Sequence, residues 1–538
     1  MKYSVIYSLC LMFFVGCLNP AMAQKVPSKK PNIIIILADD MGYSDIGAFG
    51  SDVQTPNLDE MANKGLKLTQ FYNASRCCPS RASLLTGLYP HQAGVGHMVN
   101  TRPQPAYQGY LNKNCVTIAE VLKQNGYATF MGGKWHVGQA KEHWPLQRGF
   151  DKYFGLIDGA NSYFDNRPYR PNQKLTIALD NEPYTPGKNY YSTDAYTDFA
   201  IDFISQKEKE KPFFLYLAYQ APHWPLHAKE EDIAKYRGKF MKGWEMMRKE
   251  RYQKQLKSGI IHKSTKLSSL DSACRKWDSL SAEEKINWDE KMAVYYAMID
   301  RVDQNIGKLR RKLKEMGEEE NTVIMFLSDN GGSSESISNT GFKPEILKAN
   351  LLPASNPQSF TAYGLEGANV SNTPFRLFKH WEYEGGTATP FIAYGPAIVK
   401  PKQQSHQPAH LIDLMATCLE LSGASYPTEY GGNKIVPAEG KSLVPLFKNE
   451  KRIGHELIGF EHEGNRALRM GDWKLVSAYP ANIWELYHLK SDRSELTNVA
   501  GKYPEKVEQL ILEYENWANR VGVIPFELLD KNKSKDKY

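Results

Sequence analysis

Four short apolar runs are spaced along the chain, and polar residues closely follow each of them. The runs cover residues 32–38, 127–131, 212–218 and 322–328. A continuous apolar run of this length is typical of a strand that is covered on both faces, as in the centre of a parallel sheet. The polar residues would then lie beyond the carboxyl ends of the strands, where open α/β sheets bind their ligands.

Amphipathic stretches lie between these runs, and several of them end at a glycine. The pattern predicts helices at residues 57–64, 79–86, 116–125, 195–204 and 293–316. The first three are followed directly by Gly65, Gly87 and Gly126, which suits the end of a helix. Strands that alternate with helices predict an α/β fold in which helices cover both faces of the sheet.

Two stretches depart from this alternation. Residues 229–282 are rich in charge and serine, so we expect a surface insertion near the opening of the site. From about residue 426, short strand candidates precede a helix at 505–518, which predicts a small antiparallel α+β subdomain. We therefore predict a large N-terminal domain over residues 31–425, which includes the insertion, and a C-terminal subdomain over residues 426–538.

The N-terminus has the features of an export signal. Lys2 supplies a positive charge, residues 5–15 form an apolar stretch, and Ala23 ends a small-residue cleavage site. We predict a signal peptide over residues 1–23 and a periplasmic mature protein. Cys17 offers an alternative, because residues 14–17 weakly resemble a lipoprotein processing site, which would give a lipid-anchored outer-membrane protein. No later segment is apolar and long enough to predict a membrane span.

Charge and cysteine content narrow the range of functions. The net charge of +7 comes with no basic helix or aromatic–basic ladder, so we predict no nucleic-acid partner. Five of the seven cysteines would remain after cleavage at Ala23, and an odd number without regular spacing does not indicate a disulfide framework. Cys77 and Cys78 are adjacent, whereas zinc-binding pairs are usually separated by roughly two to four residues. This pair therefore needs another explanation.

Two of the predicted strands end in oxygen-rich pairs. Asp39 and Asp40 follow the first strand, and Asp329 and Asn330 follow the fourth. Three carboxylates in one place repel one another unless a cation compensates their charge. Capping of helices or turns explains a single aspartate more simply, whereas two such pairs at strand ends favour a metal site over capping. Oxygen ligands suit a hard ion, so we predict one divalent cation, Ca²⁺ in preference to Mg²⁺.

The decisive motif is Cys77-Cys78-Pro79-Ser80-Arg81, which a small-residue helix and Thr-Gly follow. It resembles the signature of the type I sulfatases, Cys-x-Pro-Ser-Arg. In that family a formylglycine-generating enzyme oxidises the first cysteine to formylglycine. The positions of Pro79 and Arg81 match Cys77 to that cysteine and Cys78 to the variable position. The resemblance implies that a hydrated formylglycine at residue 77 attacks sulfate monoesters and that inorganic sulfate is released.

The same resemblance, over roughly residues 31–518, implies a fold and a metal site. The fold would be alkaline-phosphatase-like, with a large mixed, mostly parallel sheet sandwiched by helices and a smaller C-terminal α+β subdomain that contains an antiparallel sheet. The modified Cys77 would join the two oxygen-rich pairs as a metal ligand. Arg81, one turn into the helix, would hold the hydrated aldehyde and its metal environment.

Three further segments match the same family. Residues 133–136 read Gly-Lys-Trp-His, which implies that Lys134 contacts the sulfate and that His136 hydrogen-bonds the formylglycine hydrate. His223 matches a strand-end histidine that protonates the leaving oxygen or binds sulfate. Lys379 precedes Glu-Gly-Gly at a short spacing and matches the second sulfate-binding lysine. Its Phe-Lys-His context differs from the family pattern, so Arg376 or His380 could share this role.

The alcohol part of the substrate is only weakly indicated. A sulfated carbohydrate is predicted, because an exported sulfatase suits the scavenging of host or environmental glycans. Trp135, Trp224 and Trp381 could stack on sugar rings or could equally belong to the core, and His97 could lie at the sugar subsite. The alternatives are a simple arylsulfatase, a phosphate or phosphonate ester hydrolase of the same superfamily, and a glycan-binding protein that has lost catalysis.

Overall fold

The computed structural model describes residues 29–338 and 341–530, so the predicted export signal and Cys17 lie outside the described residues. Its largest element is an eleven-stranded sheet in which the strands follow the order β10-β2-β9-β8-β1-β7-β3-β4-β5-β6, with β11 beside β2. Within the described ranges, no helix is both long and apolar enough to cross a membrane.

The centre of this sheet is parallel and contains all four strands that the sequence predicts. These are β1 (Asn32–Ala38), β3 (Ala128–Gly133), β7 (Phe213–Ala218) and β8 (Thr322–Ser328). β1 lies between β7 and β8, and β3 pairs with β7 on the far side, all in parallel. Each of these four strands is buried along its whole length, as expected for strands that helices cover on both faces.

Strands that the apolar pattern does not reveal make the sheet mixed. β9 (Ala388–Tyr394) pairs antiparallel with β8, and β2 (Leu66–Tyr72) pairs antiparallel with β9. The sheet also contains β4 (Lys152–Leu156), β5 (Ile177–Leu179), β6 (Glu182–Pro183), β10 (Gln403–Ser405) and β11 (Ala409–His410). The large, mixed and mostly parallel sheet expected from the sequence is therefore present.

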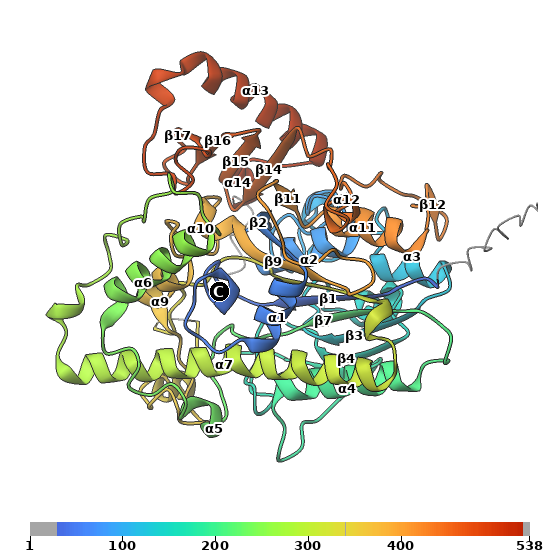
Figure 1. The fold of residues 1–538 in the computed structure, drawn as a ribbon, viewed down its shortest axis with the longest axis horizontal. Helices are drawn as coiled ribbons and strands as arrows, with labels where there is room; N and C mark the ends of the chain where they lie inside the picture. Colours follow the sequence, from blue (N-terminus) through green and yellow to red (C-terminus); the bar gives the residue numbers. More distant parts are fainter. Residues whose placement is uncertain (1–28, 339–340, 531–538) are drawn as a thin grey trace, which may run out of the picture.

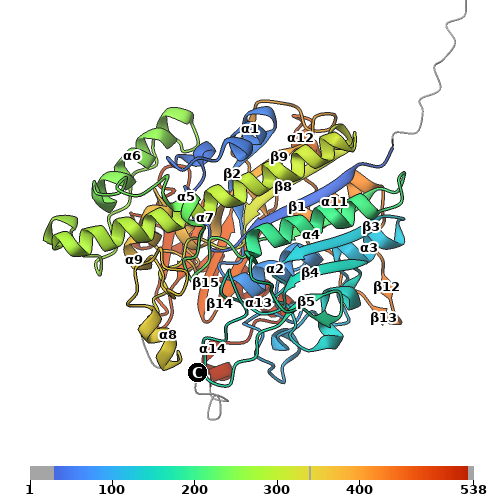
Figure 2. The ribbon, with the colours of Figure 1, turned by 90° about the horizontal axis from the view of Figure 1, so that it is seen from below.

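Helices cover both faces of the sheet (Figure 2). On one face, α1 (Pro56–Lys64), α4 (Ser192–Gln206) and α7 (Ala282–Glu315) share a core with Ile34 and Ile36 of β1. The opposite core contains Ile33 and Ile35 together with α2 (Cys77–Thr86), α3 (Ile118–Gln124) and α11 (Asp413–Ser422). α7 begins eleven residues before the predicted start at residue 293, because a capping box at Ser281 starts the helix there.

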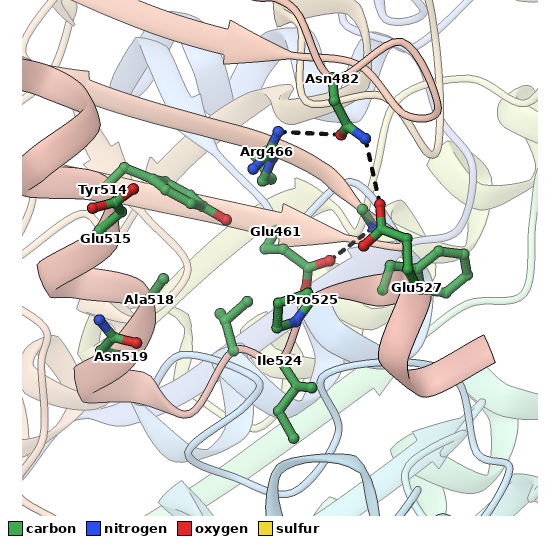
Figure 3. A pocket seen from close by; sticks show the side chains of 13 residues that line it. Glu461, Arg466, Asn482, Tyr514, Glu515, Ala518, Asn519, Ile524, Pro525 and Glu527 are labelled. Carbon is green, nitrogen blue, oxygen red and sulfur yellow. Dashed lines mark hydrogen bonds between the residues drawn. The ribbon is translucent and has the colours of Figure 1, made fainter. Parts of the chain in front are cut away.

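The C-terminal part forms a second sheet above the large one (Figure 1). β14 (Leu457–His462), β15 (Asn465–Met470), β16 (Trp473–Ser477) and β17 (Trp484–His488) pair antiparallel in that order. α13 (Pro504–Val521) packs on this sheet, and α14 (Phe526–Asp530) follows it. Between the sheet and these helices lies a cavity of about 510 Å³, in which Asn482 bridges Arg466 and Glu527 (Figure 3).

The charged stretch at residues 229–282 is more deeply integrated than a surface insertion. It contains α5 (Glu230–Ile233) and α6 (Gly243–Ser258), and α6 packs against α9 (Gly364–Ser371). Arg251 of α6 is fully buried and contacts Asp45, in the loop after β1, at 2.8 Å. The remaining short elements are α8 (Pro344–Ala349), α10 (Glu384–Thr387), α12 (Val444–Phe447), β12 (Glu429–Tyr430) and β13 (Asn433–Lys434).

Candidate active site

The register of β1 and β8 brings the two oxygen-rich pairs together. Ala38 lies opposite Ser328, so the next residues of both strands meet at the same edge of the sheet. Asp40 donates its backbone N–H to Asp329 Oδ1 at 3.3 Å, and Asn330 Nδ2 donates to Asp40 Oδ1 at 2.7 Å. Asp39 belongs to the same buried group. The structure therefore brings together the four residues that the sequence proposes as metal ligands.

A basic side chain contacts each of the three carboxylates. Lys134 Nζ lies 2.5 Å from Asp39 Oδ2, an Arg81 guanidinium nitrogen lies 2.7 Å from Asp329 Oδ2, and Lys379 Nζ lies 2.9 Å from Asp40 Oδ1. Burial still raises the pKa of Asp39 to about 6, although Lys134 and Arg81 lower it. Burial and the neighbouring Asp39 raise the pKa of Asp329 to about 8. Lys134 and Arg81 therefore do not fully stabilise the negative charges of Asp39 and Asp329.

These residues fit a bound cation. Asp39 Oδ1 and Asn330 Oδ1 are buried and have no hydrogen-bond partner among the residues that the structure describes. Buried polar atoms normally have partners, so two unpaired oxygens at one place indicate a ligand. Because both donors are oxygens beside further carboxylates, a hard divalent ion suits the site better than zinc does.

Cys77 lies in the first turn of α2 and lines a cavity of about 480 Å³. The sequence places the start of this helix at Pro79, but the structure places it at Cys77. Cys78 is completely buried, does not line this cavity, and has its sulfur 3.3 Å from His136 Nε2. A hydrogen bond with Cys78 and the positive charge of Lys134 hold the pKa of Cys77 well below its ordinary value, although burial raises it. Of the two cysteines, only Cys77 is open to a substrate in the cavity.

His136 and His223, the two predicted catalytic histidines, line the same cavity. His223 Nδ1 lies 2.6 Å from the backbone oxygen of Trp224, and Lys379 Nζ lies 3.5 Å from His223 Nε2. In the tautomer that carries its proton on Nδ1, this proton is donated to the Trp224 oxygen. Nε2 then has a lone pair with which it can accept a proton. Burial lowers the pKa of both His136 and His223 to about 4, so both rings are neutral at pH 7 in the free protein.

The structure adds residues that the sequence does not identify. Glu335, in the loop after β8, contacts Lys379 at 3.3 Å, Arg76 at 3.1 Å and Trp224 Nε1 at 2.7 Å. Arg76 directly precedes the cysteine motif, which is the only signal in the sequence that could have marked it. The cavity is also lined by Gln139, Asp158, Tyr169, Arg170, Gln173, Lys174 and Glu463.

Several expectations are modified by the geometry. Lys134 is completely buried and does not line the cavity, and its Nζ lies 2.5 Å from Asp39 Oδ2. Trp135 is a core residue and Trp381 lies away from the lining, so Trp224 is the only one of the three tryptophans at the cavity. His97 lines the cavity, and its role at a sugar subsite stays a prediction. None of residues 229–282 lines it.

Comparison with known proteins identifies the family. The sulfatase family model matches residues 31–424, which is well over half of the chain. The chain belongs to the sulfatase family. A second model, N-sulphoglucosamine sulphohydrolase, C-terminal, matches residues 375–516 of this sulfatase.

Individual relatives of the sulfatase cover most of its length. An uncharacterised sulfatase of Schizosaccharomyces pombe is 35% identical over 535 residues, which cover 94% of this chain and 96% of the relative. An arylsulfatase of Klebsiella aerogenes is 33% identical over 434 residues, covering 79% of this chain and 93% of the relative. The crystal structure of Ps i-CgsB in complex with k-i-k-neocarrahexaose matches with a TM-score of 0.65 at 28% identity, covering 91% of this chain and 93% of that chain.

These likenesses confirm the family and the fold that the cysteine motif implies. The sulfatase is a sulfuric ester hydrolase of the formylglycine-dependent family, within the alkaline-phosphatase-like superfamily. The site described above lies at the carboxyl ends of β1, β3, β7 and β8, which are neighbours in the sheet. The fold therefore places side chains from four distant segments around Cys77.

Proposed function

We propose that this sulfatase releases inorganic sulfate from sulfated carbohydrates, such as host or environmental glycans. The observation that carries the proposal is the shared cavity of Cys77, His136, His223 and Lys379, next to the buried oxygen-rich pairs. A sulfate group in this cavity would meet the nucleophile, a cationic donor and two imidazoles at once. Positive charge arranged in advance around a developing anion is usually the largest contribution to such catalysis.

One divalent cation, Ca²⁺ in preference to Mg²⁺, would bind at the ends of β1 and β8. Its ligands would be Asp39, Asp40, Asp329, Asn330 and the modified Cys77. The unpaired oxygens of Asp39 and Asn330 support this assignment. The ion would supply positive charge next to the sulfate oxygens. Ca²⁺ is preferred because it accepts irregular sets of about six to eight oxygen ligands, whereas Mg²⁺ demands a regular octahedron.

Cys77 would be converted to formylglycine by a formylglycine-generating enzyme. The hydrated aldehyde supplies one hydroxyl that attacks sulfur and a second that, on losing its proton, releases sulfate. Residue 77 lies in the first turn of α2, where backbone N–H groups without a partner inside the helix point toward the helix end. These groups would stabilise negative charge on the hydrated aldehyde. Arg81 would fix the geometry of this turn, since it binds both Asp329 and the backbone oxygen of Lys134.

The remaining side chains would bind sulfate and move protons. Lys379, which lines the cavity, would contact the sulfate directly, and Lys134 would stabilise it through its positive charge from its buried position next to Asp39. His223 Nε2 would relay a proton from the Lys379 ammonium, 3.5 Å away, to the leaving oxygen, because Nδ1 keeps its own proton against a backbone oxygen. His136 would assist proton loss from the formylglycine hydrate.

Three features support a sugar as the alcohol. The cavity, at about 480 Å³, has room for more than a sulfate group, and Trp224 and Tyr169 line it as aromatic surfaces for a ring. His97 lies at the same cavity, where it would contact the sugar. The match to a structure that contains a neocarrahexaose supports a carbohydrate, whereas the arylsulfatase relative supports the aryl alternative.

Export would fit this role. The signal proposed at residues 1–23 would deliver the mature enzyme to the periplasm, where glycan fragments arrive from outside the cell. A lipid anchor on Cys17 is the alternative route and would leave the enzyme at the outer membrane.

The proposal is tested with a panel of sulfated monosaccharides, a chromogenic aryl sulfate and matching phosphate and phosphonate esters. We expect kcat/KM to be highest for a sulfated sugar. Turnover of the aryl sulfate alone would exclude the carbohydrate proposal in favour of a simple arylsulfatase. Faster turnover of phosphate or phosphonate esters than of any sulfate ester would favour the other hydrolase class of this superfamily.

A further inference from the structure

We propose that His97, His462 and Glu463 form a second metal site, which takes a transition metal such as Zn²⁺. His97 lies in the segment after α2, whereas His462 and Glu463 lie at the turn between β14 and β15. Two imidazoles and one carboxylate are a ligand set that zinc accepts readily. The site is chemically different from the oxygen-rich set at Asp39, and its existence does not depend on the proposed function.

His462 gives the strongest indication of a ligand. Its side chain is fully buried, and neither ring nitrogen has a hydrogen-bond partner within residues 29–338 and 341–530. An imidazole buried in this way costs free energy, because it has lost its hydrogen bonds to water and has gained none in return. A bond from one of these nitrogens to a metal would offset that cost.

The three ligand atoms are already close to the spacing that zinc requires. His97 Nδ1 lies 3.3 Å and His462 Nε2 lies 3.8 Å from the same oxygen of Glu463, and all three atoms are within 4.8 Å of one another. Ligands about 2.0–2.1 Å from a tetrahedral zinc ion are about 3.3–3.4 Å apart. Small movements of the His97 and His462 rings would therefore bring the three ligand atoms to the distances that a tetrahedral zinc ion requires.

A further histidine orients the carboxylate. His380 Nδ1 lies 3.1 Å from Glu463 Oε2, and Asn465 donates to His380 Nε2 at 3.1 Å. Since Nε2 accepts this hydrogen bond, Nδ1 carries the proton and donates it to Glu463. One carboxylate oxygen is thereby held, and the other is directed at His97 and His462. Hydrogen bonds of this kind around metal ligands fix their orientation.

The turn that carries the site is fixed between two cavities. Glu463 lines the cavity at Cys77, whereas Glu461 and Gly464 line the C-terminal cavity (Figure 3). Glu461 accepts the N–H of Gly464 at 2.9 Å and contacts His91 at 2.8 Å, which ties the turn to the large domain. A bound ion with three protein ligands would keep a fourth position, and this position would face the cavity at Cys77.

The charges around the site permit a cation. Glu463 supplies one negative charge among the ligands, and the neighbouring Arg76 is paired with Glu335 at 3.1 Å. In the fourth position, water or a substrate oxygen would complete the coordination. The site would then contribute to recognition of the alcohol part of the substrate, while the chemistry takes place at residue 77.

The test is zinc binding by an untagged, chelator-treated protein that has been saturated with Ca²⁺. The Cys77→Ser/Cys78→Ala background is used, because it removes the thiol cluster with His136, which could also bind zinc. Calorimetry should find one Zn²⁺ site, and Zn²⁺ should raise the unfolding temperature. His462→Asn and Glu463→Gln should each weaken binding at least 10-fold, whereas His262→Asn, at an exposed histidine, should leave it unchanged.

Zinc-edge anomalous scattering from crystals of the same protein gives an independent answer should either variant fail to fold. An ion between His97, His462 and Glu463 supports the proposal. Absence of stoichiometric Zn²⁺ binding, equal binding by every variant, or an ion located elsewhere overturns it. None of these outcomes depends on sulfate turnover, so a failure here is distinguishable from a failure of the proposed function.

Discussion

Glu335 accepts a hydrogen bond from Lys379, with 3.3 Å between Oε2 and Nζ. The same carboxylate binds Trp224 Nε1 at 2.7 Å and Arg76 at 3.1 Å, so one residue positions three donors around the cavity. Although burial alone would raise it, Lys379 and Arg76 hold the pKa of Glu335 well below its ordinary value. Glu335 is therefore charged at neutral pH and fixes the direction of the Lys379 ammonium.

Replacing this charge should reduce catalysis without unfolding the protein. We expect Glu335→Gln to lower kcat/KM about 10- to 100-fold, because hydrogen bonds to a charged group contribute about 1.5–3 kcal/mol each. Glu345→Gln, at an exposed position of α8, is the matched control and should retain wild-type kinetics. Steady-state kinetics on a sulfate ester measure the effect, and equal activity of the two variants would show that Glu335 has no positioning role.

The two adjacent cysteines should differ sharply in importance. Cys77 lines the cavity and Cys78 does not, so Cys77→Ala should abolish sulfate release, by about 10³-fold or more, through loss of the nucleophile. Cys78→Ala should keep activity within about 10-fold, because it removes buried contacts with His136, Met98 and Cys77 but no side chain that lines the cavity.

Mass spectrometry of the peptide that contains both cysteines supplies the control. In protein from the native host, we expect the mass change for an aldehyde in place of the thiol at residue 77. This change should persist in Cys78→Ala and be lost in Cys77→Ala. An unmodified thiol in active enzyme would contradict the formylglycine assignment.

The centre of the sheet follows from the sequence, but its mixed character does not. β1 and β8 are continuous apolar runs, so their bounds are predicted correctly. β9 contains Pro390, which normally argues against an internal strand, since proline cannot donate to a neighbour. The structure accommodates it at an irregularity in the pairing of β2 with β9, between Leu68 and Phe71. The hydrophobic pattern around Pro390 cannot reveal this irregularity, because it depends on pairing with a strand that is distant in the sequence.

The candidate site divides in the same way. Asp39 and Asp329 directly follow β1 and β8, so the position of each strand predicts the position of the side chain. Glu335 lies several residues beyond its strand, and Glu463 comes from a hairpin of the C-terminal sheet. The position of Glu335 depends on the path of its loop, and the position of Glu463 depends on how the C-terminal sheet packs against the large one. Short-range sequence patterns predict neither.

Glu382 should make stability depend on pH. Burial raises its pKa from 4.5 to about 8, although a hydrogen bond from Ser75 lowers it, and its second oxygen has no partner among the described residues. The folded state therefore holds a proton that the unfolded state loses above pH 4.5. This stabilisation is complete below pH 4.5 and is lost as the pH rises to about 8, at up to about 1.4 kcal/mol per pH unit.

Glu382→Gln should remove this part of the pH dependence. The amide resembles the protonated acid in shape but carries no titrating group, so the variant should become more stable than wild type as the pH approaches 8. Urea unfolding of both proteins at pH 5.5, 7 and 8.5 measures the difference in free energy. A constant difference across this range would show that Glu382 is not protonated in the folded state.

Arg251 should anchor the charged stretch at residues 229–282 to the loop after β1. Its guanidinium contacts Asp45 at 2.8 Å, Ser44 Oγ at 2.7 Å and Tyr296 OH at 2.7 Å, all in the interior. We expect Arg251→Met to lower the free energy of unfolding by about 3–5 kcal/mol, because it leaves the Asp45 carboxylate buried without its cation. Arg237→Met, in the same stretch, breaks only an exposed ion pair with Glu230 and should cost less than about 1 kcal/mol.

The same substitution should also affect the proposed cation site. Asp45 accepts the N–H of Gly42 at 2.8 Å, and Gly42 lies two residues after Asp40, so the fold links Arg251 to a proposed metal ligand through one short loop. We therefore expect Arg251→Met to weaken Ca²⁺ binding as well as stability, whereas Arg237→Met should change neither. Calorimetric Ca²⁺ titration well below the unfolding temperature of each variant separates the two effects. Unchanged Ca²⁺ affinity in a destabilised Arg251→Met would mean that this loop holds its shape without the buried arginine.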